Sequence, residues 1–230
     1  ANGLSLNSGT LRDAAGNDAT LTFAAVSDNA GYLVDTTAPS APTVAALGST
    51  NDTTPTITGV AEANSTVKVY EGSTLLGTTT ADGNGAWSFT PTSALGQGAY
   101  SVTATATDAA GNTSVASGAQ SLVIDTTAPT VSSVAITSAT GLQNSTLNAG
   151  DVVSVTVTMS EATTVTGTPQ LALNIGGATV QANYASGSGT TALVFTYTIV
   201  SGETDANGIS VDANGLSLNS GTLRDAAGND

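Results

Sequence analysis

The sequence contains no cysteine and no histidine, and only 3 of its 230 residues are lysine or arginine. Without cysteine no disulfide can cross-link the fold, so packing or bound metal must hold it together. The absence of histidine and cysteine also excludes His-assisted acid–base chemistry and cysteine nucleophiles. Paired carboxylates remain formally open, but we find no catalytic machinery and expect a protein that is not an enzyme.

The shortage of positive charge leaves 17 acidic residues uncompensated, with a net charge of −14 and a pI of about 4.1. Such a surface repels phosphate backbones and anionic lipids, which argues against nucleic-acid and membrane partners. Cations are the natural partners. No apolar run approaches the roughly 20 residues of a membrane span, and the first residues do not open a signal peptide. We therefore expect an interior segment of a longer protein.

Aromatic residues make up only 4% of the chain, although hydrophobic residues make up 40%. The apolar residues are mostly Val, Ala, Leu and Ile set among Thr and Ser. β-branched residues favour the pleated, half-buried backbone of a strand, and the 26 glycines supply turns. The composition predicts an all-β fold.

Two short phrases recur and divide the chain. Asp-Ala-Ala-Gly-Asn occurs at 13–17, 108–112 and 225–229, and Asp-Thr-Thr-Ala-Pro occurs at 35–39 and 125–129. Residues 213–230 are identical to residues 1–18, so we expect a super-repeat with a period of 212 residues.

Within that period we predict tandem immunoglobulin-like β-sandwiches of two alternating module types. Residues 39–127 form one complete module. Residues 128–230 form a module of the second type that lacks its final strands, and residues 1–38 carry the closing strands of a preceding second-type module. The modules are short enough to be single sandwiches.

Seven short strands are predicted in the first module, which is the number typical of an immunoglobulin-like sandwich. Trp87 and Phe89 alternate on one strand and are expected to fill the core, while Tyr100 is placed to form a tyrosine corner. The predicted strands lie near 41–48, 56–61, 65–71, 74–80, 86–90, 99–107 and 114–124.

The second module shows the same period-2 alternation from Val153 to Met159, Leu171 to Ile175 and Leu193 to Ile199. A strand containing Leu21 and Phe23 should close its sheet. We hypothesise that residues 19–34 pair with residues 131–230 of another copy, or stay unpaired.

Acidic residues concentrate at the joints between modules. Because successive strands run in alternating directions, three loops of the first module lie at the end of the module where the linker enters. Those loops carry carboxylates, and the linker adds one more. The predicted set at this first joint is Asp35, Glu62, Asp82, Asp108 and Asn112.

The second joint repeats the arrangement, with Asp125 in the linker, Glu161 in a loop after the second strand, and Asp225 with Asn229 in the late loop. Like charges gathered in this way repel unless a cation lies between them. Calcium takes six to eight oxygen ligands, whereas zinc would require the missing His or Cys. We therefore predict Ca²⁺ at both joints.

An alternative interpretation keeps these residues in loops for turn formation alone. It is as strong as the metal interpretation for Asp82. It is the stronger interpretation for Asp52, Asp205 and Asp212. These residues could still bind a second ion at the end of a module where the chain leaves it.

The Asp-x-x-Gly-Asn and Asp-Thr-Thr-Ala-Pro phrases, on Thr- and Val-rich strands without cysteine, resemble the bacterial Ig-like repeats of giant secreted adhesins and biofilm-associated surface proteins. The second module, with Met-Ser-Glu-Ala at 159–162, is similar to a longer variant in the same proteins. The resemblance implies RTX-type, type I-exported proteins whose family ligand positions map onto Asp35, Asp108, Asp125 and Asp225.

Three functions follow from these patterns. The first is a calcium-rigidified structural stalk repeat of an extracellular bacterial adhesin, which extends adhesive regions from the cell surface and contacts neighbouring repeats. The second is a subunit of a self-assembling filament or surface layer, joined by intermolecular strand complementation. The third is a carbohydrate-binding or hydrolytic module, which the lone Trp87 does little to support.

Overall fold

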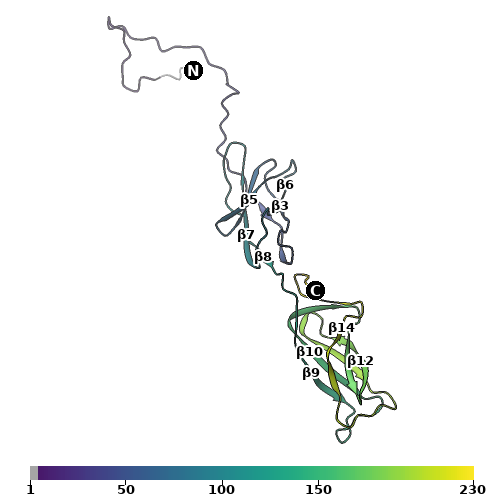
Figure 1. Ribbon diagram of the computed structural model, residues 1–230. Coiled ribbons are helices and arrows are strands. Elements are labelled where there is room, and N and C mark those ends of the chain that lie inside the picture. The colour runs from purple at the N-terminus through teal and green to yellow at the C-terminus, as the bar shows by residue number, and fades with distance from the viewer. Residues whose placement is uncertain (1–4) are drawn as a thin grey trace. The chain divides into compact units, whose positions relative to one another are not determined.

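The computed structural model describes residues 5–230, and these contain strands but no helix (Figure 1). The chain divides into two compact units, Ala1–Thr37 and Ala38–Asp230. All the strands described lie in the second unit, in two groups. The prediction of an all-β fold is confirmed.

The first unit, in its described residues 5–37, contains a single isolated bridge between Arg12 and Asp18. Residues 19–34 lie in no strand. Most of their large apolar side chains are exposed: Tyr32 is 83% and Val34 is 89% accessible to solvent, whereas Leu21 is half-buried.

The first group of strands forms a sandwich of two sheets. One sheet has the order β1-β3-β6 and the other β2-β8-β7-β4-β5. The strands are β1 (Thr43–Val44), β2 (Gly48–Thr50), β3 (Ile57–Val60), β4 (Thr66–Glu71), β5 (Thr74–Thr80), β6 (Ala86–Phe89), β7 (Gly98–Thr107) and β8 (Gln120–Ile124).

The strand predicted over 41–48 is two short strands in different sheets. β1 pairs with β3, and β2 pairs in parallel with β8. Gly48, where β2 begins, has a φ of 102°, which glycine adopts without steric cost. The chain thus crosses from one sheet to the other at a residue that tolerates the change of direction.

The last strand of this sandwich is shorter than the predicted 114–124. The hydroxyl oxygens of Ser114 and Ser117 accept hydrogen bonds from the backbone N–H groups of Ala106 and Ala104, each at 3.0 Å. These side chains take the place of carbonyl acceptors, and regular pairing begins only at Gln120.

Trp87 and Phe89 lie in the core of the first sandwich, only 3% and 8% accessible, as predicted. A Cβ at Gly59 would collide with the Trp87 ring, so glycine is required beneath it. The predicted tyrosine corner is also present, because the Tyr100 hydroxyl donates to the carbonyl of Gly96 at 2.7 Å.

The second group of strands forms one seven-stranded sheet, with the order β14-β11-β12-β13-β10-β15 and with β9 paired to β10. It encloses its own core of Val, Leu and Ile side chains with Phe195, and we call it the second sandwich. The strands predicted around Val153, Leu171 and Leu193 are all present. The strands are β9 (Val131–Thr140), β10 (Val152–Thr166), β11 (Gln170–Ile175), β12 (Ala178–Ser186), β13 (Thr190–Thr198), β14 (Ser210–Ser217) and β15 (Thr222–Arg224).

Strand β10 is long because it changes partners along its length. Residues 152–159 pair with β9, residues 152–158 and Thr163 pair with β13, and residues 164–166 pair with β15. The register shifts between Thr158 and Thr163, as a β-bulge requires. The prediction that Glu161 lies in a loop is therefore wrong: it lies within β10, at this irregularity.

Three strands of the second sandwich have a single described partner each. β9 and β15 each pair with β10, and β14 pairs with β11. The side chains of β9 are mostly exposed, including Val134 at 39% and Ile136 at 42%. All three strands therefore present a sheet edge.

Candidate metal centre

The Asp-Ala-Ala-Gly-Asn phrase folds into the same loop in each of its three copies. In each loop the Asp N–H donates to the Asn carbonyl, at 3.0, 3.1 and 3.2 Å for Asp13, Asp108 and Asp225. The Asn side-chain amide donates back to the Asp carboxylate at 2.8, 2.8 and 2.7 Å. The phrase is thus a self-contained unit that fixes one carboxylate.

The backbone conformation of each loop requires glycine at the fourth position of the phrase. Gly16, Gly111 and Gly228 have φ values of 85°, 93° and 96°. L residues with a Cβ are strained in this left-handed region, and glycine is not. The tight return that brings Asn back to Asp therefore depends on glycine at this position.

At the second joint three acidic side chains converge. Asp125, Glu161 and Asp225 each offer a carboxylate oxygen, and these oxygens all lie within 4.8 Å of one another. We call them the joint cluster. Asp225 is buried at 6% accessibility, and the other two are half-buried.

Each member of the joint cluster is held by a different element. Asp125 directly follows β8, and its N–H donates to the carbonyl of Thr50 at 3.0 Å. Glu161 lies at the bulge of β10. Asp225 follows β15 and opens the last copy of the Asp-Ala-Ala-Gly-Asn loop.

The side chain of Asn229 connects the linker to the late loop, residues 225–229. Its side-chain amide donates to the Asp125 carbonyl at 2.9 Å and to the Asp225 carboxylate at 2.7 Å. A backbone bond from Asn51 N–H to the Ala227 carbonyl, at 3.1 Å, joins the first sandwich to the same loop. The nitrogen of Asn229 therefore positions two members of the joint cluster.

The linker is also fixed beside Glu161. Thr130 N–H donates to the Ser160 hydroxyl at 2.9 Å, and Ser160 N–H donates to the Thr130 carbonyl at 2.7 Å. This reciprocal pair holds the start of the second sandwich against the bulge. Glu161, the next residue, is thereby brought toward Asp125.

The surroundings of the joint cluster shift the pKa values of Glu161 and Asp225 in opposite directions. Burial raises the pKa of Glu161, and the neighbouring Asp225 and Asp125 charges raise it further. Burial also raises the pKa of Asp225, but hydrogen bonds from Asn229, Gly228 and Ala227 outweigh it and leave that pKa below its ordinary value. Asp225 is thus held as an anion, while Glu161 resists ionisation.

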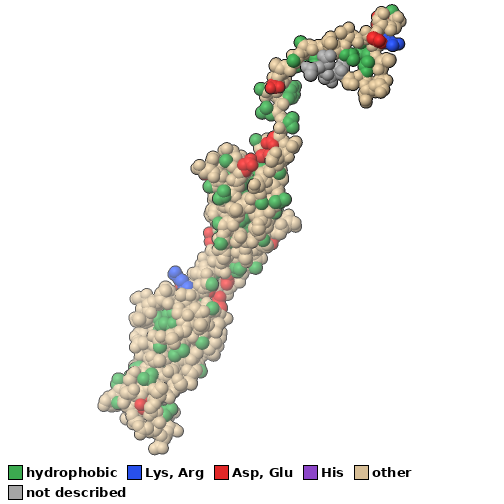
Figure 2. All heavy atoms as spheres, turned by 180° about the vertical axis from the view of Figure 1, so that it is seen from behind, with side chains coloured by type: hydrophobic (Ala, Val, Ile, Leu, Met, Phe, Trp, Pro, Cys, Tyr) green, Lys and Arg blue, Asp and Glu red, His purple; other side chains and the backbone are tan. Residues whose placement is uncertain are grey.

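Two of the three basic residues of the chain, Arg12 and Arg224, form ion pairs elsewhere. The salt bridges among residues 5–230 join Arg12 to Asp18 and Arg224 to Asp230. Neither includes a carboxylate of the joint cluster, although Arg224 directly precedes Asp225. Figure 2 accordingly shows few blue side chains on a mostly uncharged, tan surface.

The donors of the joint cluster suit a hard cation. Asp225 Oδ1 already accepts three backbone N–H groups at 2.7–2.9 Å, whereas its Oδ2 accepts only the Asn229 amide. Three carboxylates with nearby carbonyls form an oxygen-only ligand set, which fits Ca²⁺ better than metals that prefer nitrogen or sulfur. The residues present therefore fit calcium.

The set predicted at the first joint belongs to both units, with Asp35 in the first and Glu62, Asp82 and Asp108 in the second. Asp35 accepts the N–H of Thr37 at 3.0 Å. Its assembly with the other three into a metal site stays a prediction.

Within the second unit, Asp108 and Asp82 are oriented by their own loops. The Asp108 carboxylate accepts the N–H and side-chain amide of Asn112, both at 2.8 Å, and the side-chain bond is the main reason its pKa is lowered. Asp82 Oδ1 accepts the N–H groups of Asn84 and Ala86 at 2.8 and 2.9 Å. These contacts are what the turn interpretation of Asp82 expects.

Two other acidic residues hold turns in the way that the turn interpretation describes. Asp205 accepts the N–H groups of Gly176, Asn207 and Gly208 at 2.9–3.0 Å, and the bond from Gly176 is the main reason its pKa is lowered. Asp52 accepts the N–H of Thr54 at 2.8 Å.

Sequence reasoning missed the contacts of Asn51, Thr130 and Ser160 at the second joint. Asn51 contributes its backbone N–H, which every non-proline residue has, so its identity gives no signal. Ser160 did offer a signal in the sequence, because it lies beside Glu161 in the Met-Ser-Glu-Ala phrase.

Comparisons with known proteins agree with the fold. Residues 34–126 match the family described as Bacterial Ig-like domain. This segment holds the complete first sandwich with its tyrosine corner, so the prediction of Ig-like sandwiches is confirmed. No curated protein matches the sequence significantly.

Solved structures show low-scoring similarity to the chain. A chitinase, ChiA74 from Bacillus thuringiensis, is 17% identical with a TM-score of 0.30, over 86% of this chain and 28% of that one. The fibronectin(III)-like modules of Clostridium thermocellum CbhA are 15% identical with a TM-score of 0.33, over 77% and 87%. A tetra-tandem repeat from the extending region of a large adhesion protein is 19% identical with a TM-score of 0.28, over 81% and 49%.

The chain thus spans less than a third of the chitinase and about half of the adhesion-protein structure. In the part of the chain that the structure describes, no helix is long and apolar enough to cross a membrane.

Proposed function

We propose that this chain is a calcium-rigidified structural stalk repeat of an extracellular bacterial surface protein. The observation that carries the proposal is the joint cluster, in which the linker residue Asp125 meets Glu161 and Asp225 of the following sandwich within 4.8 Å. An ion held by both sides restricts the linker between two folded modules.

The physical argument rests on charge. Three carboxylates that approach one another without a cation destabilise the joint. The pKa of Glu161 is raised first by its burial and then by the neighbouring Asp225 and Asp125 charges. A calcium ion reverses the sign of the interaction, and it favours the arrangement that brings its ligands together. The joint is then stiff when calcium is bound and looser when it is removed.

The expected affinity is modest. Extracellular calcium modules typically bind with a Kd of about 10⁻⁴ to 10⁻³ M. At a free calcium concentration ten times the Kd, binding stabilises the folded state by about 1.4 kcal/mol per site. Many such joints in series stiffen a long array.

The family match over residues 34–126 supports a bacterial Ig-like module, and a small module of this kind suits a repeated extension. An extracellular location at the bacterial cell surface suits a calcium-dependent joint, because free calcium is plentiful there. The partners in this proposal are calcium ions and neighbouring repeats, and the adhesive regions of a biofilm or host-binding protein lie elsewhere.

Calorimetric titration with CaCl₂ tests the proposal on the full chain, with MgCl₂ titrated in parallel. We expect calcium binding that Glu161→Gln and Asp225→Asn each weaken at least tenfold at the second joint. Asp28→Asn, which removes an exposed carboxylate of the first unit, is the matched control and leaves that binding unchanged. Absence of calcium binding, or equal binding by all variants, would contradict the proposal.

A second candidate is a subunit of a self-assembling filament or surface layer. The open edges of β9 and β14 favour it, because unpaired edges pair readily with strands of another chain. Light scattering distinguishes the two functions. A filament subunit forms species of increasing mass with concentration, whereas a tandem stalk repeat reaches a limiting small oligomer or stays monomeric.

A further inference from the structure

A single side chain of the first sandwich, Gln97, binds both threonines of the linker. Its amide nitrogen donates to the Thr127 hydroxyl at 2.9 Å. Its amide oxygen accepts the hydroxyls of Thr126 and Thr127, each at 3.1 Å. The two threonines of the Asp125–Pro129 phrase therefore share one partner, which lies in the loop between β6 and β7.

The loop that carries Gln97 is itself fixed on both sides. The Tyr100 hydroxyl donates to the carbonyl of Gly96, the residue before Gln97, at 2.7 Å. Gly98, the residue after it, pairs with Ile124 at the end of β8. Gln97 thus reaches the linker from a backbone that the tyrosine corner and the sheet hold in place.

The contacts of the linker divide it into two anchored stretches. The N–H of Asp125 donates to the Thr50 carbonyl at 3.0 Å, and Gln97 holds the two threonines that follow. The second sandwich holds Thr130, whose N–H donates to a hydroxyl on β10 at 2.9 Å. Residues 128–129 lie between the two stretches, and the proline restricts its own φ and the residue before it.

Loss of the Gln97 contacts would lengthen the mobile part of the linker, to residues 126–129 rather than 128–129 alone. The carboxylates of Glu161 and Asp225 move with the second sandwich, whereas Asp125 stays with the first. A longer mobile stretch lowers the fraction of molecules in which the three carboxylates meet. The apparent affinity of a ligand for them falls in proportion to that fraction.

We propose that Gln97 is a positioning residue of the joint. It limits the turning of the linker and so keeps Asp125 opposite Glu161 and Asp225. It acts through the two linker threonines and not as a ligand. The effect on calcium affinity rests on the proposed function, whereas the restriction of the linker needs no metal.

Hydrogen exchange of the full chain in chelator tests the restriction of the linker without any metal. Gln97→Met removes the amide and keeps an unbranched side chain. We expect the amides of residues 125–127 to exchange about fivefold faster in this variant, as the loss of a hydrogen bond of ordinary strength implies. Unaltered exchange at residues 125–127 would overturn the proposal, whatever the calcium affinity.

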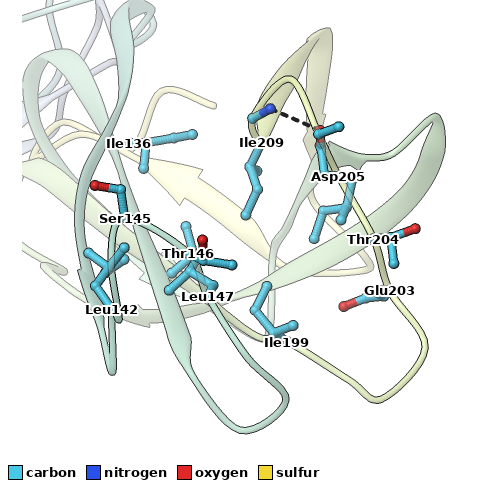
Figure 3. A pocket seen from close by; sticks show the side chains of 15 residues that line it. Ile136, Leu142, Ser145, Thr146, Leu147, Ile199, Glu203, Thr204, Asp205 and Ile209 are labelled. Atoms are coloured by element: carbon cyan, nitrogen blue, oxygen red, sulfur yellow. Dashed lines mark hydrogen bonds between the residues drawn. The ribbon is translucent and has the colours of Figure 1, made fainter.

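The other end of the second sandwich supplies the internal reference for this measurement. The N–H groups of Asn207 and Gly208 donate to the Asp205 carboxylate at 3.0 and 2.9 Å, and Figure 3 shows this loop with Asp205. The loop follows the end of β13 that pairs with Val152, away from the bulge of β10. Its amides should exchange equally fast in both chains.

Calorimetric titration with CaCl₂ tests the effect on affinity. Gln97→Met should weaken binding at the second joint about three- to fivefold, because the competent fraction falls while every ligand remains. Gln181→Met, at an exposed position of β12, is the matched control and leaves the affinity unchanged.

A double-mutant cycle shows whether Gln97 acts through the threonines. Thr126→Val with Thr127→Val should weaken calcium binding as much as Gln97→Met does, and the two changes together should weaken it no further. Additive losses would overturn the proposal, because a second route of action would then be needed.

The two measurements separate this inference from the proposed function. Faster exchange at residues 125–127 in a chain that binds no calcium would support the role of Gln97 and contradict only the calcium joint. Calcium binding that is equal in the wild type and Gln97→Met, with equal exchange, would overturn the role of Gln97 and leave the proposed function intact.

Discussion

The side-chain amide of Asn229 donates a hydrogen bond at 2.9 Å to the backbone carbonyl of Asp125, which lies 104 residues earlier in the chain. The same nitrogen donates to the carboxylate of Asp225 at 2.7 Å. One side chain thus ties the linker to the late loop of the next sandwich, and it sets two carboxylates close together before any ion arrives.

Asn229→Ala removes both of these bonds. We expect a loss of about 1–2 kcal/mol in the free energy of unfolding of the second sandwich, because a partly buried carboxylate and a carbonyl lose their donor. Urea denaturation measures it. Asn17→Ala is the matched control: Asn17 makes the same bond inside its own loop but belongs to the first unit. If the two substitutions have equal effects on the second sandwich, the linking role of Asn229 is wrong.

Gly228→Ala tests the backbone of the late loop. Gly228 has a φ of 96°, and a Cβ there would meet its nearest neighbour, the Asn51 side chain, at an ordinary 3.8 Å. The cost is therefore conformational and should be about 1–2 kcal/mol. Gly83→Ala, where a Cβ meets nothing within 4 Å and φ is not left-handed, is the control. Equal melting temperatures for the two variants would contradict this account.

Glu161→Gln should change stability in opposite directions with and without calcium. The folded-state pKa of Glu161 is raised, so its contribution is fully present at low pH and is lost as the pH rises through that pKa. Without calcium at neutral pH, the substitution removes a repelled charge and raises the melting temperature. With calcium it removes a ligand and lowers the melting temperature.

A pH series in chelator supplies the check. The melting temperature of the wild type should fall relative to Glu161→Gln as the pH rises from the ordinary range of a glutamate into the range just above it. Curves that stay parallel across that range would show that neither burial nor the neighbouring charges raise the pKa of Glu161.

Tyr100→Phe isolates the tyrosine corner of the first sandwich. It removes the 2.7 Å bond to the Gly96 carbonyl and keeps the ring, so we expect a loss of about 1 kcal/mol in the free energy of unfolding of that sandwich. Tyr70→Phe on β4 is the control. A loss no larger than that of the control would leave the corner without a stabilising role.

Much of the fold could be predicted from the sequence because strand alternation reports burial directly. Trp87 and Phe89 point inward as the period of two requires, and the strand limits of β4 and β5 agree within a residue. The prediction that Glu161 lies in a loop failed for a physical reason. A bulged strand and a loop both interrupt alternation, and only the pairing of β10 with β15 distinguishes them.

The candidate site could be predicted only in part. Repeated phrases located Asp125 and Asp225, because linker and late-loop carboxylates recur at fixed positions. The role of Asn229 as a donor could not be predicted, because the direction of its amide depends on a carbonyl distant in sequence. The hydrogen bonds accepted by the Ser114 and Ser117 hydroxyls, which shorten the last strand of the first sandwich, could not be predicted either, because they too depend on backbone groups of another strand.

The central claim is that calcium stiffens the joint between the two sandwiches. Because the chain has no native cysteine, Ser88→Cys on β6 and Gln181→Cys on β12 accept spin labels at exposed sites without competing reactions. The distribution of distances between the two labels measures the stiffness of the joint. We predict a narrow distribution with calcium, a broad one with chelator, and a broad one in both conditions when Glu161→Gln is added. Distributions of equal width with and without calcium would contradict the account.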